Sequence, residues 1–163
     1  MVDLISQTVM RAGSWADPFD TCVLPYEERL LRRKVLHTVQ DASLLVDLPK
    51  ATSIDHGDAF ALSDGRHIEV LAAKEDLLQI TAPDLLALVW HIGNRHCPAQ
   101  IEPSRVLIQP DHVIRDLMER RGATVIPVFE PFTPEGGAYG HGRTQGHSYG
   151  HNQKHEPGHS HDR

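Results

Sequence analysis

Hydrophobic and polar positions follow two different periods along the chain. In residues 1 to about 73, short apolar runs with an alternating pattern are separated by turn residues, which predicts strands. The predicted strands are Asp3–Val9, Arg29–Val39, Ser43–Leu48 and His67–Ala73. Asp64–Gly65 is a typical pair for a tight turn. This region therefore predicts a small, mostly β domain.

One predicted strand carries a basic stripe, formed by Arg29, Arg32, Arg33 and Lys34. One interpretation is that the stripe is a solvated strand face. The alternative is an exposed sheet edge that binds a peptide by strand addition. The sequence alone leaves both interpretations open.

From about residue 74 the pattern changes to strand, helix, strand, helix, strand. Leu77–Thr81 predicts a short strand, and Pro83–Asp84 predicts a helix start with proline in the first turn. Gly93–Asn94 suits the end of that helix. Its apolar residues recur at helical spacing and are Leu85, Leu86, Val89, Trp90 and Ile92. This spacing supports the prediction of a helix.

The second half of this region repeats the pattern. Ala99–Gln109 predicts a strand or a strand pair whose buried part is Val106, Leu107 and Ile108. Asp111 is a plausible N-cap of a second helix, with Val113, Ile114, Leu117 and Met118 on one face and Gly122 after its end. Ala123–Phe129 predicts the last strand. Two helices interleaved with strands indicate a ferredoxin-like βαββαβ layer.

The end of the chain, from near Pro134, has almost no aliphatic residues and is rich in glycine and histidine. Such a segment buries too little apolar surface to offset its chain entropy, so we expect disorder. The predicted division is a β domain at 1–73, a ferredoxin-like domain at 74–138 and a tail at 139–163. The predicted fold class is α+β.

Composition narrows the functional classes. The chain has 163 residues and a formal net charge of −6, which argues against a nucleic-acid partner. Its two cysteines form neither a disulfide framework nor a CxxC zinc ribbon. The first residues do not resemble a signal peptide, and no apolar run approaches the ~18 residues of a membrane span. We therefore expect a cytoplasmic protein with no membrane partner.

Histidine is the compositional outlier, with twelve in the chain and six of them in the tail. The tail histidines are His141, His147, His151, His155, His159 and His161. Neutral imidazole is a common ligand of Ni, Cu and Zn, and such tracts are typical of metal binding. An expression tag would have contiguous histidines, whereas these are interspersed. The tail predicts a metal but does not select one; affinity alone would favour copper.

Three more histidines lie in the second predicted domain. His91 and His96 are five residues apart, so they do not share one helix face, and His112 follows the predicted cap Asp111. Cys97 is open to interpretation as a soft ligand or as a buried free thiol. The sequence has no HExxH motif and no Ser-His-Asp or Cys-His constellation.

Three segments in a fixed order resemble the urease accessory protein UreE family, the nickel metallochaperones of urease maturation. They are HIGNRHCPAQIE at His91–Glu102, the helix start at Asp111–Ile114, and FEPFTPEGGAYGHG at Phe129–Gly142. The resemblance extends over essentially the whole chain. It implies an N-terminal β domain similar to a peptide-binding domain of Hsp40 chaperones, followed by a ferredoxin-like metal-binding domain.

The resemblance also implies roles for individual residues. His96 matches the histidine that binds one Ni ion across the two-fold axis of a homodimer. His112 matches a peripheral metal histidine, although Pro110 stands where some members have a further histidine. The tail histidines match in kind rather than by position, and His91 is assigned to packing or hydrogen bonding.

The implied function is delivery of Ni(II), carried as cargo, to urease apoprotein through the urease GTPase accessory protein. Zn(II) or Cu(II) would compete for the same ligands. A general Ni/Zn buffer is the alternative, and metal-linked pairing of dimers into tetramers is left open. We expect no enzyme, because a hydrolase needs a water-activating site with a nearby base and the sequence offers none.

Overall fold

A computed structural model describes residues 4–136 of the chain, which form two sheets and two α-helices. The six strands of the first sheet are β1 (Leu4–Met10), β2 (Asp20–Leu24), β3 (Leu30–His37), β4 (Ser43–Ser53), β5 (Ala59–Leu62) and β6 (His67–Ala72), with a 3-10 helix, η1 (Tyr26–Arg29), before β3. The second sheet and its helices are β7 (Lys74–Thr81), α1 (Leu85–Asn94), β8 (Ala99–Ile101), β9 (Val106–Ile108), α2 (His112–Arg120) and β10 (Thr124–Pro131).

The first sheet has the strand order β2-β6-β5-β1-β4-β3. Strand β4 shows why these sequences form strands, because Leu44, Val46 and Leu48 alternate with more exposed residues and point into one core. Phe60, Ile68 and other buried apolar residues complete that core. The alternating apolar pattern therefore fixes the register of the sheet.

All four strands predicted in this region are present, with ends shifted by a few residues, but two further strands were missed. Both β2 and β5 are short, and they are held in place by β6, which pairs with each of them. The turn predicted at Asp64–Gly65 is confirmed: it joins β5 to β6, and Gly65 has a φ of 88°. Glycine adopts such a positive φ without steric strain.

The interpretation of the basic stripe as one solvated face is wrong for Arg29. That residue lies in η1, is buried, and donates a hydrogen bond to the backbone oxygen of Phe132. The other three members of the stripe, Arg32, Arg33 and Lys34, are exposed on β3, an edge strand of the sheet. Burial of Arg29 depends on a contact 103 residues away, which local patterning does not reveal.

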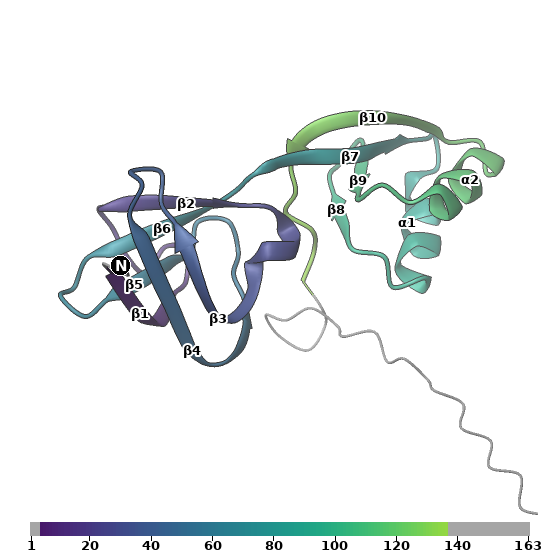
Figure 1. Cartoon of the computed structure of the whole chain (residues 1–163). Coiled ribbons are helices and arrows are strands. Elements are labelled where there is room, and N and C mark those ends of the chain that lie inside the picture. The colour runs from purple at the N-terminus through teal and green to yellow at the C-terminus, as the bar shows by residue number, and fades with distance from the viewer. Residues whose placement is uncertain (1–3, 137–163) are drawn as a thin grey trace, which may run out of the picture.

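The second sheet has the order β10-β7-β9-β8, and every pairing in it is antiparallel. Helices α1 and α2 lie together beside this sheet (Figure 1). Leu78, Ile80, Val106 and Ile108 from the strands pack against residues of the helices, including Ile92 and Met118. This is the predicted ferredoxin-like βαββαβ arrangement, and the predicted strand pair within Ala99–Gln109 is confirmed.

Helix α1 begins slightly later than predicted and buries only part of its apolar surface. It begins at Leu85, so Pro83 precedes it, and Asp84 is its N-cap, accepting a hydrogen bond from the backbone N–H of Ala87. Its buried residues are Leu88 and Ile92, whereas Leu86 and Trp90 face away from the core. The helix therefore has a second apolar face that packs on no element within residues 4–136.

A third apolar cluster joins the two sheets. Leu77, Leu107 and Phe132 are buried together, and Tyr26 of η1 packs against them. The rings of Tyr26 and Phe132 meet edge to face with centroids 5.3 Å apart. The backbone N–H of Tyr26 also donates to Glu75 Oε2 at 2.9 Å. The chain thus passes from one sheet to the next through a packed junction.

The fold class is α+β, as predicted. The predicted three-part division at 1–73, 74–138 and 139–163 stays a prediction, and the predicted disorder of the tail concerns residues outside those the structure describes. Among residues 4–136, no helix combines the length and the apolar character needed to cross a membrane.

Candidate metal site

The turn that follows α1 places His96 in an unusual backbone conformation. The helix ends at Asn94, and the backbone N–H of His96 donates to Gly93 O at 3.0 Å. The N–H of Cys97 donates to Ile92 O at 3.3 Å. These two bonds define a Schellman motif, whose C′ residue adopts the left-handed conformation. Here that residue is His96, with a φ of 55°.

Glycine is the usual residue at this position, because a side chain there costs roughly 1–2 kcal/mol. The predicted helix end at Gly93–Asn94 is confirmed, because α1 ends at Asn94. The residue in the left-handed conformation is His96, two residues beyond that end. The imidazole is exposed and makes no hydrogen bond within residues 4–136. A strained backbone that holds an exposed imidazole makes His96 a candidate functional residue.

His112 is the first residue of α2 and is also exposed. Its position is fixed by Asp111, whose side chain accepts hydrogen bonds from the N–H groups of Val113 at 2.9 Å and Ile114 at 3.0 Å. Asp111 is therefore the N-cap, as predicted. The cap satisfies the first turn of the helix and leaves the His112 side chain directed to solvent.

Cys97 links the two histidines in space. Burial, and then the nearby Asp111 carboxylate, raise the pKa of the Cys97 thiol. The end of α1 and the start of α2 lie at the same end of the helical layer, because β8, which follows α1, runs antiparallel to β9, which precedes α2. A raised pKa favours the neutral thiol, whereas metals bind the thiolate. Cys97 packs against the core of this domain, which supports the interpretation as a half-buried free cysteine.

The position of His91 is consistent with the packing role that the resemblance implies for it. It is half-buried in the last turn of α1, and its ring lies edge to face with Trp90, with centroids 4.9 Å apart. Its ring is therefore part of the helix surface.

The structure brings two of the predicted ligands to one end of a domain but does not assemble a complete metal site. Within residues 4–136, no group of three or more His, Cys, Asp and Glu side chains has an arrangement that could hold a metal ion. The six predicted tail ligands, His141 to His161, lie outside the described residues. A single copy of the described chain therefore offers His96 and His112 as separate exposed imidazoles.

The last described residues reach this end of the domain, which sequence patterning did not predict. The backbone N–H of Glu135 donates to Ala99 O at 2.8 Å, and that of Thr133 donates to Gln100 Oε1 at 2.8 Å. Ala99 is three residues beyond His96. The only local signal was Pro134, which disfavours regular structure because its nitrogen carries no hydrogen, without indicating where the segment docks.

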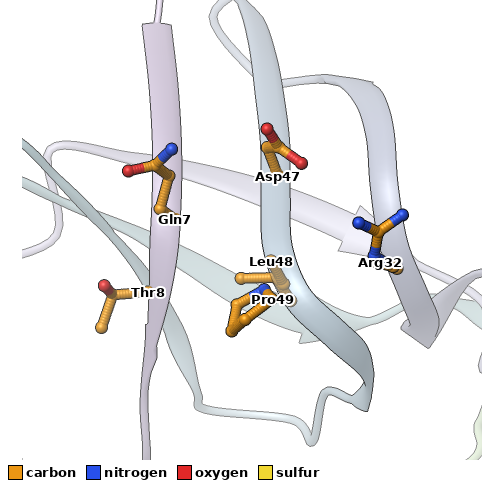
Figure 2. Close-up of a pocket in the computed structure, with 6 residues that line it drawn as sticks. All are labelled: Gln7, Thr8, Arg32, Asp47, Leu48 and Pro49. Carbon is orange, nitrogen blue, oxygen red and sulfur yellow. The ribbon is translucent and has the colours of Figure 1, made fainter.

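An open groove of about 510 Å³ lies on the first sheet (Figure 2). Its lining residues come from β1, β3 and β4 and are Gln7, Thr8, Arg32, Asp47, Leu48 and Pro49. Both charge signs are present, through Arg32 and Asp47. The groove borders the basic edge strand, but the predicted peptide-binding edge stays a prediction. The groove contains no histidine or cysteine and is not a candidate nickel site.

Comparison with known proteins supports the resemblance described above. The family model described as UreE urease accessory protein, N-terminal domain, matches residues 3–73, and the model of the C-terminal domain matches residues 75–162. The chain belongs to the UreE urease accessory protein family.

Individual members of the UreE family are similar over most of the chain. A urease accessory protein UreE from Ruegeria pomeroyi is 60% identical over 141 residues, which cover 86% of this chain and 95% of the relative. One from Cereibacter sphaeroides is 49% identical, covering 91% of this chain and 81% of the relative. One from Rhodobacter capsulatus is 50% identical, covering 90% of this chain and 94% of the relative. The similarity to UreE thus includes both sheets and the turn that carries His96.

Proposed function

We propose that the protein is a cytoplasmic nickel metallochaperone that delivers Ni(II) to urease apoprotein during assembly of the urease active site. The observation that carries this proposal is the exposed imidazole of His96, held in a left-handed turn that ordinarily favours glycine. Membership of an accessory-protein family supports a role in urease maturation rather than in urea hydrolysis.

A second copy of the chain would complete the site. One imidazole is too few ligands to hold nickel, and a two-fold axis beside His96 supplies the same imidazole from the partner. Exposed apolar side chains on α1 support such a contact: Leu86 is 83% exposed and Trp90 is 63% exposed. They lie four residues apart, on one face of the helix that ends at the His96 turn.

The mechanism is ligand exchange and involves no bond chemistry in a substrate. Two imidazole nitrogens hold the ion, and water or tail imidazoles complete its coordination. Incoming donors from urease apoprotein or from the urease GTPase accessory protein displace these weakly held ligands. An incomplete protein ligand set suits a carrier, because the ion must leave as well as bind. Zn(II) and Cu(II) bind imidazole as well and compete with nickel.

His112 would be a peripheral ligand at the same end of the domain. It lacks a histidine partner two residues before it, where this chain has the exposed Pro110. We therefore assign it a weaker site than His96. Its exposure in the first turn of α2 supports access to metal but gives no fixed geometry with His96.

A general Ni/Zn buffer without a dedicated client is the second candidate, favoured by the six tail histidines. The two functions differ in which histidines matter. A buffer loses nearly all binding when the tail histidines are replaced, whereas a carrier retains one ion per dimer.

The experiment compares three full-length proteins with all six tail histidines changed to alanine: the parent, a His96→Ala variant and a His91→Ala control. The proposal predicts one Ni ion per two chains in the parent and the control, and none in the His96 variant. Activation of urease apoprotein should follow the same order. If the His96 variant binds one ion per dimer and activates urease normally, the assignment is wrong.

Affinity should also depend on pH. Only neutral imidazole is a metal ligand, so protons compete with nickel, and affinity should fall steeply below about pH 6. Calorimetric titrations at pH 7 and pH 5 measure this directly. Equal affinities at the two pH values would contradict ligation by histidine.

A further inference from the structure

The open groove on the first sheet lies where the pairing of two interior strands is interrupted. The parallel pairing of β1 with β4 ends at Ser6 and Val46. The register of β1 with β5 on its other side shifts between Ser6 and Thr8, so Gln7 is an extra residue of β1. An extra residue of this kind forms a β-bulge. Strand β1 therefore bulges at the point where it stops pairing with β4.

Strand β4 is interrupted at the same place, on its side toward β3. Leu31 pairs with Thr52, and Arg33 pairs with Asp47. One residue of β3, Arg32, therefore stands opposite the four residues of β4 between these pairs. Both β1 and β4 are interior strands in the order β2-β6-β5-β1-β4-β3. Protection of an exposed edge, a common role of bulges, does not explain interruptions in interior strands.

These interruptions leave backbone groups of three strands available at the groove. Within residues 4–136, Gln7, Arg32 and residues 48–51 have no partner in the register of the first sheet. Backbone N–H and C=O groups require hydrogen-bond partners, which water supplies in an open groove. An extended peptide offers the same kind of partners, because it carries a row of N–H and C=O groups.

The side chains that line the groove add charge and apolar surface. Figure 2 shows Gln7 of β1 and Arg32 of β3 on either side of β4, which carries Asp47, Leu48 and Pro49. Leu48 and Pro49 provide the apolar part. Among the described residues, the Arg32 guanidinium and the Asp47 carboxylate have neither an ion-pair nor a hydrogen-bond partner. Both charged groups are therefore available to a bound molecule.

Positive charge around the groove selects the kind of peptide. The exposed cations here are Arg32, Arg33, Lys34 and Lys50. Glu28 lies 3.7 Å from Lys34, and the other three cations have no anionic partner in the described part of the chain. Such a cluster attracts acidic side chains and repels basic ones.

We propose that the groove binds a short, extended and acidic segment of a partner protein. The backbone of the segment pairs with the interrupted strands, one of its acidic side chains contacts Arg32, and an apolar side chain lies on Leu48 and Pro49. Asp47 accepts a hydrogen bond from an N–H of the segment. The groove volume of about 510 Å³ lies within the roughly 300–1,000 Å³ that is typical of ligand sites. This site goes beyond the proposed function, because it is on the other sheet from His96 and contains no nickel ligand.

The test uses a fluorescein-labelled peptide of about six residues that alternates valine and glutamate, and a counterpart that alternates valine and lysine. Fluorescence anisotropy at pH 7 and low ionic strength measures binding to the full-length protein, and amide chemical shifts of the protein locate the contact. Arg32→Ala removes the cation that lines the groove. Arg33→Ala is the matched control, because it removes the same charge from the next residue of β3, which does not line the groove.

The proposal predicts that the glutamate peptide binds and shifts the amide signals of Gln7, Asp47 and Leu48, whereas the lysine peptide does not bind. Arg32→Ala should weaken binding about tenfold, because a hydrogen bond to a charged group is lost, and Arg33→Ala less than about twofold.

Three results would overturn the proposal: no binding of the glutamate peptide, equal binding of both peptides, or equal losses for Arg32→Ala and Arg33→Ala. Equal losses would place the peptide on the outer edge of β3 instead of in the groove. The His96→Ala variant should bind the peptide as the parent does, so a failure of the nickel assignment and a failure of the groove are measured separately.

Discussion

Two loops of the molecule treat their polar side chains in opposite ways. In the first domain, the Asp58 carboxylate is 2% exposed and accepts hydrogen bonds from Arg11 Nη1 at 2.7 Å, Ala12 N at 2.9 Å and Asp55 N at 2.8 Å. In the second domain, the His96 imidazole is exposed and has no partner within residues 4–136. One loop uses its polar group to hold the fold, and the other presents its polar group to solvent at a cost in backbone strain.

This comparison separates structural from functional residues without reference to a ligand. A buried and fully bonded carboxylate stabilises the loop that carries it. An unbonded imidazole in a left-handed turn adds nothing to stability, so its presence requires another reason.

The largest expected effect on stability belongs to Asp58. Asp58→Ala would leave two backbone N–H groups and the Arg11 guanidinium without their acceptor, and should lower the free energy of unfolding by about 3 kcal/mol. Urea unfolding monitored by circular dichroism measures the change. Asp64→Ala is the matched control, since Asp64 forms an ion pair with Arg66 on the surface, and it should leave the unfolding midpoint almost unchanged. A similar loss for both variants would mean that burial of Asp58 is unimportant.

At His96 we expect a substitution that raises the free energy of unfolding. His96→Gly should raise the free energy of unfolding by about 1 kcal/mol, because glycine adopts a φ of 55° without the steric cost of a side chain. His96→Ala keeps that cost and should leave stability close to that of the parent. Both variants should lose nickel at the shared site. If His96→Gly is less stable than His96→Ala, the turn is not strained in the way the backbone indicates.

The smallest expected effect on stability concerns the ion pair of Arg105 and Glu130. It tests whether charged groups in the second domain are generally without partners. Arg105 forms a bidentate pair with Glu130, with both N–O distances at 2.7 Å. This hydrogen bonding lowers the pKa of Glu130. A lowered folded-state pKa contributes stability that is present above the unfolded pKa and is lost as pH falls through the folded value.

Glu130→Gln should therefore reduce stability slightly at pH 7, and the difference from the parent should shrink as the pH falls below about 4. Thermal unfolding at a series of pH values measures this difference. If the difference in stability between the Glu130→Gln variant and the parent grew as the pH fell, the ionised Arg105–Glu130 pair would not be stabilising. The expected result would show that charged groups elsewhere in this domain have partners, so that the exposure of His96 is specific to its turn.

The same contrast explains what the sequence could and could not predict. Features set by neighbouring residues were predictable: Asp111 caps α2 because its side chain reaches N–H groups two and three residues away, and Gly65 forms the β5–β6 turn. The end of α1 at Gly93–Asn94 was also predictable from neighbouring residues, but only the backbone shows that His96 takes the left-handed conformation two residues later.

Features set by distant contacts were not predictable. Arg29 looked like part of an exposed stripe until its bond to Phe132 was visible, and the short strand β2 forms only beside β6. At the candidate site, the identity of His96 followed from a resemblance of motifs, while its exposure and its strained backbone came from the structure. The histidine content of the tail indicated a metal but did not indicate a position in the fold.

The central claim is that two copies of His96 bind one nickel ion. The most direct measurement is a calorimetric nickel titration of the protein with all tail histidines replaced by alanine, combined with sedimentation to count chains. The account predicts one ion per two chains at pH 7, and loss of that ion on His96→Ala while the His91→Ala control retains it. One ion bound per dimer by the His96→Ala variant would contradict the account.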